Sequence, residues 1–174
     1  HSKKTIQFGE DLPNNILYPV PHRQFVFSIP IMLRVYFKYD RKLLTQLCHC
    51  AKESLEVFFR TVLGLDDGIL GMIMVIHTFG DYARFPPHLH AIVADGLFRR
   101  NGTFYCLPKR EFKELEAIFR SKVLAMLKGE GKACPRPRSG ITYIEDSGKV
   151  LYRSAMTHGS NKKNFEIKTS EEFI

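Results

Sequence analysis

The sequence predicts an α+β domain in which helices flank a mainly antiparallel sheet. Two stretches repeat apolar residues at helical spacing, and short apolar runs typical of strands precede, separate and follow them. Two of these runs are joined by a short connection, whereas a parallel pair needs a crossover of about a dozen residues. We therefore expect antiparallel neighbours. With 174 residues, of which 44% are hydrophobic, the chain is long enough for one sizeable core.

The two helices are predicted from apolar periodicity and from the residues at their ends. The first runs from Asp40, a favourable N-cap residue, to Gly64, a residue suited to a helix C-terminus. The second follows Pro108 and stops at Gly129. Both helices are amphipathic, so each is expected to pack one face against the sheet.

The strands are predicted from β-branched and aromatic runs bounded by turn residues. Residues 71–79 are apolar almost throughout, which is typical of a central strand buried on both faces. The chain then turns through Gly80 and Asp81 into a strand at 87–94. Further strands are expected at 24–29, 103–107, 141–144, 150–153 and 165–168.

One domain with an internal connector is the predicted organisation. Residues 1–128 are expected to form the core, and residues 129–140, rich in Gly, Pro and Arg, a flexible basic connector. Residues 141–174 are expected to add a hairpin and a strand to the same domain. They are also expected to end at a helix start, because Thr169 and Glu172 have the spacing of a capping box.

The sequence His88-Leu89-His90 places two imidazoles on one face of a predicted strand, since side chains two apart in a strand share a face. Neutral imidazoles in this arrangement can bind one divalent ion. His77 shares a face of the preceding predicted strand with Ile73 and Val75. It could join His88 and His90 as a third ligand. The sequence leaves open whether these histidines bind metal or form structural hydrogen bonds.

Charge favours a polyanionic partner. The net charge is +8, and residues 99–168 hold 16 Lys and Arg against 7 Asp and Glu. Nucleic acid or an anionic membrane surface would suit this excess. No apolar run reaches the roughly 18 residues of a spanning helix. The four cysteines lack a disulfide-framework or C-x-x-C spacing, which predicts reduced thiols in the cytoplasm. Cys48-His49-Cys50 falls within the first helix and is interpreted as structural.

Four ordered blocks carry a family resemblance. They are YPVPHRQFVFSIP at 18–30, HTFGD at 77–81, PHLHAIVADG at 87–96 and YRSAMTHG at 152–159. Together they resemble the rolling-circle transposases of insertion sequences, which belong to the HUH (His-hydrophobic-His) nuclease superfamily. The resemblance implies an HUH-like fold that cleaves and joins single-stranded DNA at transposon ends, with no membrane and no small-molecule substrate.

The resemblance also implies the chemistry of the site. His88 and His90 would be catalytic and would hold Mn²⁺ or Mg²⁺, although Zn²⁺ also suits imidazole ligands. A tyrosine hydroxyl would attack the scissile phosphate, leaving a phosphotyrosine and a free 3′-hydroxyl. Candidate phosphate contacts are Arg84, Arg153, Lys162 and Lys163.

The segment that carries the nucleophilic tyrosine in this family has no counterpart, because the connector at 129–140 takes its place. We therefore expect a truncated or internally deleted member, and no nucleophile is assigned. Tyr82 and Tyr143 are interpreted as packing or surface residues. Two alternatives stay open: a DNA-binding remnant without catalysis, and an unrelated metallohydrolase that uses the His-x-His pair.

Overall fold

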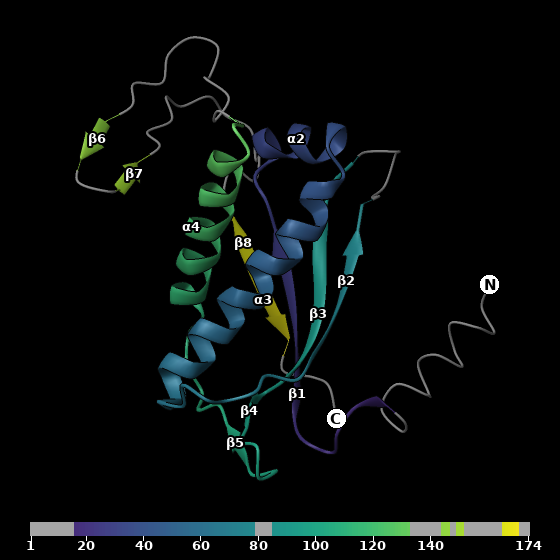
Figure 1. The fold of residues 1–174 in the computed structure, drawn as a ribbon, viewed down its shortest axis with the longest axis vertical. Coiled ribbons are helices and arrows are strands. Elements are labelled where there is room, and N and C mark those ends of the chain that lie inside the picture. The colour runs from purple at the N-terminus through teal and green to yellow at the C-terminus, as the bar shows by residue number, and fades with distance from the viewer. Residues whose placement is uncertain (1–15, 79–84, 133–143, 147–148, 152–164, 171–174) are drawn as a thin grey trace, which may run out of the picture.

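The computed structural model describes residues 16–78, 85–132, 144–146, 149–151 and 165–170. Its centre is a four-stranded sheet in the order β2-β3-β1-β8, antiparallel at every pairing (Figure 1). The strands are β1 (His22–Ser28), β2 (Met72–His77), β3 (His88–Ala94) and β8 (Glu166–Ser170). The α+β class with a mainly antiparallel sheet is thus confirmed.

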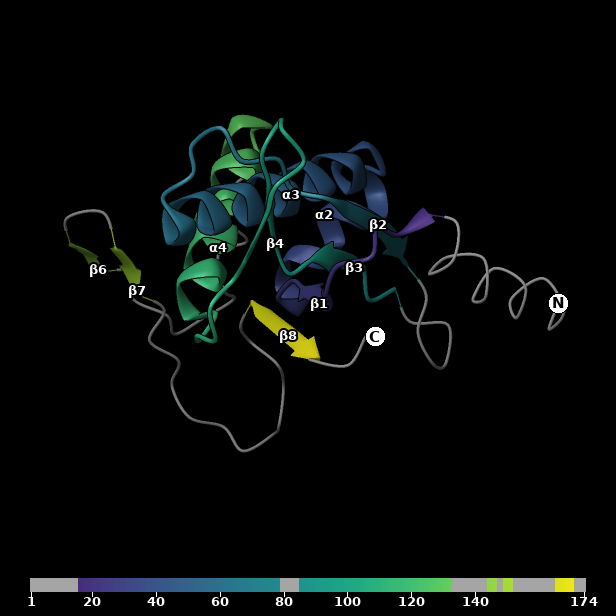
Figure 2. The same ribbon diagram turned by 90° about the horizontal axis from the view of Figure 1, so that it is seen from below.

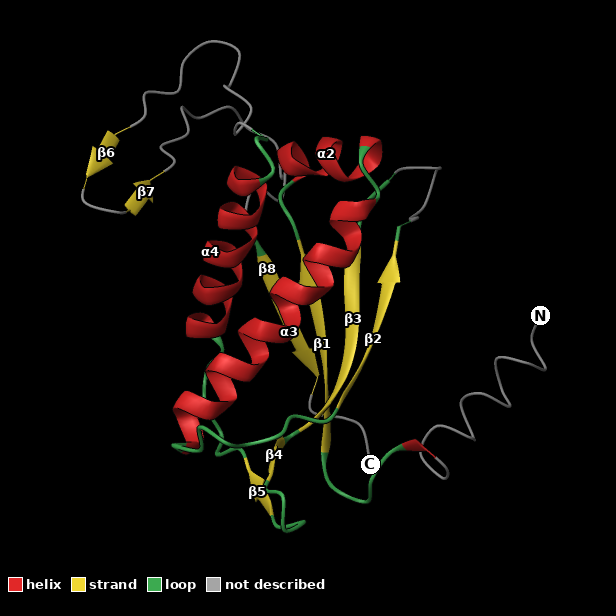
Figure 3. Ribbon diagram, viewed as in Figure 1, coloured by secondary structure: helices red, strands yellow, loops and turns green. Residues whose placement is uncertain are grey.

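Helices pack on one face of this sheet (Figure 3). The two long ones are α3 (Lys42–Leu63) and α4 (Lys113–Gly129), and both agree with the apolar periodicity of the sequence. Gly64 ends α3 in the left-handed conformation, with φ of 63°, which glycine adopts without steric cost. A 3₁₀ turn (η2, Ile31–Leu33) and a short helix α2 (Arg34–Tyr39) precede α3 and were not predicted.

The core lies between the sheet and these helices. Alternate residues of β1 and β3 point into it, and Phe25, Phe27 and Leu89 are fully buried. The Phe27 ring lies 4.9 Å from the ring of Phe119 on α4, centroid to centroid. The Phe25 ring lies 6.4 Å from that of Phe59 on α3. Burial of large aromatic side chains at this interface fixes which face of the sheet turns inward.

Two hairpins complete the described structure. Strands β4 (Gly96–Phe98) and β5 (Phe104–Cys106) pair as the Asn-Gly turn predicts. Strands β6 (Ile144–Asp146) and β7 (Lys149–Leu151) also pair in antiparallel fashion. None of the helices in these described stretches is long and apolar enough to span a membrane.

Two sequence interpretations are wrong. Strand β2 is not central: β3 is its partner within the described sheet, and its last three residues are exposed. An apolar run alone does not tell how many sides of a strand are covered, and β2 lies at an edge. Thr169 does not begin a helix but pairs with Phe25 in the ladder between β8 and β1. There, hydrogen bonding to β1 outweighs the local capping signature.

The second face of the sheet carries no helix of the described residues (Figure 2). Its residues are those that alternate with the core positions, and on β3 they include His88 and His90, both half-buried. The domain boundaries stay a prediction, because residues 133–140 of the expected connector lie outside the described residues.

Candidate metal centre

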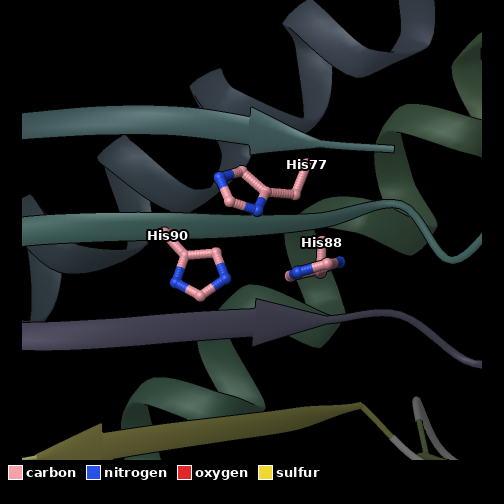
Figure 4. Close-up of side chains that lie close together, drawn as sticks. All are labelled: His77, His88 and His90. Carbon is pink, nitrogen blue, oxygen red and sulfur yellow. The ribbon is translucent and has the colours of Figure 1, made fainter. Parts of the chain in front are cut away.

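Three histidines converge on the open face of the sheet (Figure 4). The β2–β3 register places His77 directly opposite His88, and His90 follows two residues along on the same face. The ring centroids lie 5.3 Å apart for His77 and His88, 4.5 Å for His77 and His90, and 5.0 Å for His88 and His90. One nitrogen from each ring lies within 4.8 Å of the others. Two paired strands therefore position the whole cluster.

The orientation of His88 is fixed by the backbone before it. Its Nδ1 lies 2.7 Å from the carbonyl oxygen of Pro86. A carbonyl oxygen can only accept, so Nδ1 carries the proton and donates. In the neutral form of the ring, Nε2 then carries the lone pair that a metal ligand requires.

His90 contacts a side chain of the neighbouring strand. Its Nδ1 lies 3.1 Å from the amide nitrogen Nε2 of Gln24 on β1. Gln24 reaches this position because Val26, two residues along β1, pairs directly with His90 and shares its face. The contact joins the cluster to a third strand of the sheet.

The environment of His90 favours the neutral ring. Partial burial and, to a lesser extent, the neighbouring His77 and His88 lower the pKa of His90 from its ordinary value. Burial disfavours a charged imidazolium, and so do other imidazoles close by when they are charged. A neutral ring keeps the lone pair that binding to a cation needs.

The cluster is open to solvent on one side. His77 is exposed, whereas His88 and His90 are half-buried. Val75 and Val26 stand opposite His90 on the two adjacent strands, so aliphatic side chains flank the ring on both sides. Val26 and Val75 thus flank the His90 ring along the sheet, and the exposed His77 lies on the solvent side of the cluster.

These residues fit a divalent ion. Imidazole nitrogens bind a transition metal at about 2.0–2.1 Å, so two ligands of one ion lie at most about 4.2 Å apart. The 4.8 Å limit that relates the three nitrogens exceeds this by a few tenths of an ångström, which small side-chain rotations cover. Three neutral nitrogen donors on one side leave the remaining coordination positions for water or phosphate oxygens.

The sequence motif Cys48-His49-Cys50 contributes to no such cluster among the described residues. It lies within α3, as predicted, with Cys50 buried and His49 exposed. Burial, the main cause, together with the nearby Glu53 carboxylate raises the pKa of Cys50 to about 11. The thiolate is the metal-binding form of cysteine, so this environment disfavours a metal site there.

Of the predicted site residues, the structure brings His77, His88 and His90 together. The proposed phosphate contacts lie outside the described residues, namely Arg84, Arg153, Lys162 and Lys163. Sequence reasoning did not identify the contacts of Gln24 and Pro86 with the histidines. The sequence contains one indication of the role of Gln24: it is a polar residue on the outward face of β1, between the inward-facing Arg23 and Phe25.

Two comparisons relate the chain to known transposases. Residues 71–174, more than half of the chain, match the family model described as "Putative transposase". The chain is also 33% identical over 102 residues to the transposase for insertion sequence element IS801 of Pseudomonas savastanoi pv. phaseolicola. That match covers 59% of this chain and 24% of the relative, so the chain spans about a quarter of it. No solved structure matches the chain.

The chain therefore belongs to this transposase family. The resemblance to insertion-sequence transposases expected from its four sequence blocks is confirmed.

Proposed function

We propose that the chain binds single-stranded DNA and uses the three-histidine cluster to cleave and join it. The observation that carries this proposal is the convergence of His77, His88 and His90 on the open face of the sheet in a member of a transposase family. A phosphodiester strand is long and anionic, and an open site on a basic protein suits such a substrate better than it suits a small molecule.

A divalent cation, Mn²⁺ or Mg²⁺, would be held by His77, His88 and His90 and would polarise the scissile phosphate. The protein's own contribution is orientation. His88 presents Nε2 because the carbonyl of Pro86 accepts the Nδ1 proton, and β2 and β3 fix the spacing between the rings. Such preorganisation means that few groups need to move when the phosphate binds.

The reaction requires a nucleophile in addition to this cluster. In the proposed mechanism a tyrosine hydroxyl attacks phosphorus, the bond from phosphorus to the 3′-oxygen breaks, and that oxygen leaves as a hydroxyl. The tyrosine keeps the 5′-phosphate as an ester until a second 3′-hydroxyl reverses the step. We assign no tyrosine of this chain to the role.

Binding is proposed to rest on the basic residues outside the cluster. Arg84, Arg153, Lys162 and Lys163 would contact phosphates and keep the strand over the histidines. These contacts hold the strand without reading its sequence, so they are compatible with many DNA ends. A cytoplasmic location, where such DNA is accessible, belongs to the same proposal.

Incubation with single-stranded DNA and Mn²⁺ tests the function. A pool of randomised oligonucleotides labelled at the 3′ end is suitable, because the 3′ fragment is the one that stays on a phosphotyrosine. We expect a labelled covalent protein band under denaturing conditions for the wild type, and its loss in His88→Ala. His49→Ala is the matched control, since His49 is an exposed histidine on α3.

The outcomes separate the alternatives. Retention of DNA at low salt without a covalent band, in every variant, would indicate a DNA-binding protein without catalysis. Absence of retention at low salt would contradict both DNA-based functions.

A further inference from the structure

The contact between Gln24 and His90 affects which ring nitrogen of His90 can bind a metal ion. The inference drawn from it rests on the proposed function. Each ring nitrogen of His90 has a different neighbour. Nδ1 contacts the amide of Gln24, and the second ring nitrogen faces His88 across the cluster (Figure 4). The nitrogen that faces the cluster is the one placed to bind an ion. To do so it must carry a lone pair and no proton.

A neutral imidazole has one N–H and one lone pair. If Nε2 of His90 presents its lone pair, the proton must be on Nδ1, and Nδ1 then needs an acceptor. Nδ1 of His88 has the carbonyl of Pro86, which can only accept. The corresponding neighbour of His90 is a carboxamide, which carries both an acceptor oxygen and a donor nitrogen.

In the structure the amide nitrogen of Gln24 lies 3.1 Å from Nδ1. An N–H that donates to Nδ1 places the ring proton on Nε2, where it would occupy the position of the metal bond. A half turn of the amide about its last carbon–carbon bond exchanges nitrogen and oxygen. The oxygen then accepts from Nδ1–H and leaves Nε2 free.

We propose that Gln24 is a positioning residue for His90, with its amide oxygen accepting the Nδ1 proton when the cluster binds a divalent cation. The backbone of β1 is well suited to this role. Phe25 and Phe27 on either side of Val26 are fully buried, so the strand that carries Gln24 is anchored in the core. Only the amide group has to turn, and both orientations keep one hydrogen bond to the ring.

Variants of Gln24 test the proposal by metal affinity. Gln24→Met keeps a similar side-chain length but removes the acceptor, and we expect Mn²⁺ to bind about 10-fold to 100-fold more weakly, as for other outer partners of metal-bound histidines. Gln24→Glu offers acceptors only, and we expect affinity equal to or above that of the wild type. Gln46→Met on α3 makes the same chemical change away from the cluster and should leave Mn²⁺ affinity unchanged.

A second measurement detects the tautomer directly and needs no activity. Long-range ¹⁵N–¹H correlation spectra of the metal-free protein report which ring nitrogen of His90 is protonated. We expect the proton on Nε2 in the wild type and on Nδ1 in Gln24→Glu. With Zn²⁺ as a diamagnetic probe, the wild type should also show the proton on Nδ1.

Wild-type Mn²⁺ affinity in a folded Gln24→Met variant, or a proton on Nε2 of His90 in the metal-free Gln24→Glu variant, would overturn the role of Gln24 alone. If the wild type does not bind Mn²⁺, or if His88→Ala binds it equally well, the metal site itself is contradicted. The proposed function then fails with it. Thermal unfolding of each variant shows whether the fold is intact.

Discussion

Arg23 and Asp95 form an ion pair on the core side of the sheet, at the end of β3 opposite to His88. The Nε and NH2 atoms of Arg23 donate to the two carboxylate oxygens of Asp95 at 3.0 and 2.7 Å. The guanidinium also lies 5.2 Å from the ring centroid of Phe112, just before α4. Arg23 is only 9% exposed, so its charge depends on these neighbours rather than on water.

Loss of the carboxylate should therefore destabilise the fold. We expect Asp95→Ala to lower the free energy of unfolding by about 3–5 kcal/mol, because a buried charge loses its counter-charge. Glu114→Ala is the comparison, since its ion pair with Arg110 is mostly exposed and should contribute less than about 1 kcal/mol. Urea unfolding of both variants measures the difference. Equal losses in the two variants would contradict the structural role of the Arg23–Asp95 pair.

The hairpin of β4 and β5 depends on Gly96, the first residue of β4. A Cβ atom on Gly96 would lie 2.1 Å from the carbonyl oxygen of Tyr105 and 2.7 Å from the Phe104 ring. A contact of 2.1 Å is far inside van der Waals distance, and the oxygen belongs to the backbone of the paired strand. The two strands approach this closely because position 96 has no side chain.

Alanine at two glycines separates this packing effect from backbone propensity. We expect Gly96→Ala to lower the free energy of unfolding by about 1–3 kcal/mol through overpacking. Gly129→Ala should be neutral or stabilising by up to about 1 kcal/mol, because a Cβ atom at Gly129, the last residue of α4, would meet nothing within 4 Å. Denaturant titration of both variants tests this, and destabilisation by Gly129→Ala comparable to that of Gly96→Ala would be evidence against it.

The elements that could be predicted from the sequence are those in which apolar residues repeat often enough to show a period. The helices α3 and α4 carry apolar residues over several turns, and both were located to within a few residues of their ends. The six residues of α2 are too few to establish a helical period, and the element was missed. The edge position of β2 depends on which strands lie beside it, and one-dimensional spacing does not contain that information.

The same distinction applies to the candidate site. The juxtaposition of His88 and His90 follows from their spacing of two, so it could be predicted without knowing the sheet. The inclusion of His77 depends on the register between β2 and β3, and the sequence left it open. The contact of Gln24 depends on a second register, between β1 and β3, together with a side-chain orientation.

In the molecule as a whole, the two faces of the sheet have different roles. One face is covered by α3 and α4 and supplies the core, and the other carries the histidines (Figures 2 and 4). The strand β3, which carries His88 and His90, buries Leu89, Ala91 and Val93 in that core. A site built on strands anchored in this way keeps its spacing better than a site built on loops.

The net charge of +8 leads to a prediction about the proposed binding of single-stranded DNA. If Arg84, Arg153, Lys162 and Lys163 neutralise about four phosphates, the logarithm of the binding constant should fall with the logarithm of salt concentration with a slope of about −3. Affinity would then drop about 50-fold between about 50 and 200 mM salt.

Replacing Lys162 and Lys163 together by alanine should reduce that drop to about 7-fold, because two counterion-releasing contacts are lost. The paired control replaces Lys52 and Lys113, which lie 3.8 and 2.7 Å from Glu56 and Glu111. It removes the same formal charge from the helical side of the molecule and should leave the slope near that of the wild type. Fluorescence anisotropy with a labelled oligonucleotide at several salt concentrations measures both slopes. Equal slopes for the two double variants would show that overall charge, rather than contacts at Lys162 and Lys163, determines DNA binding.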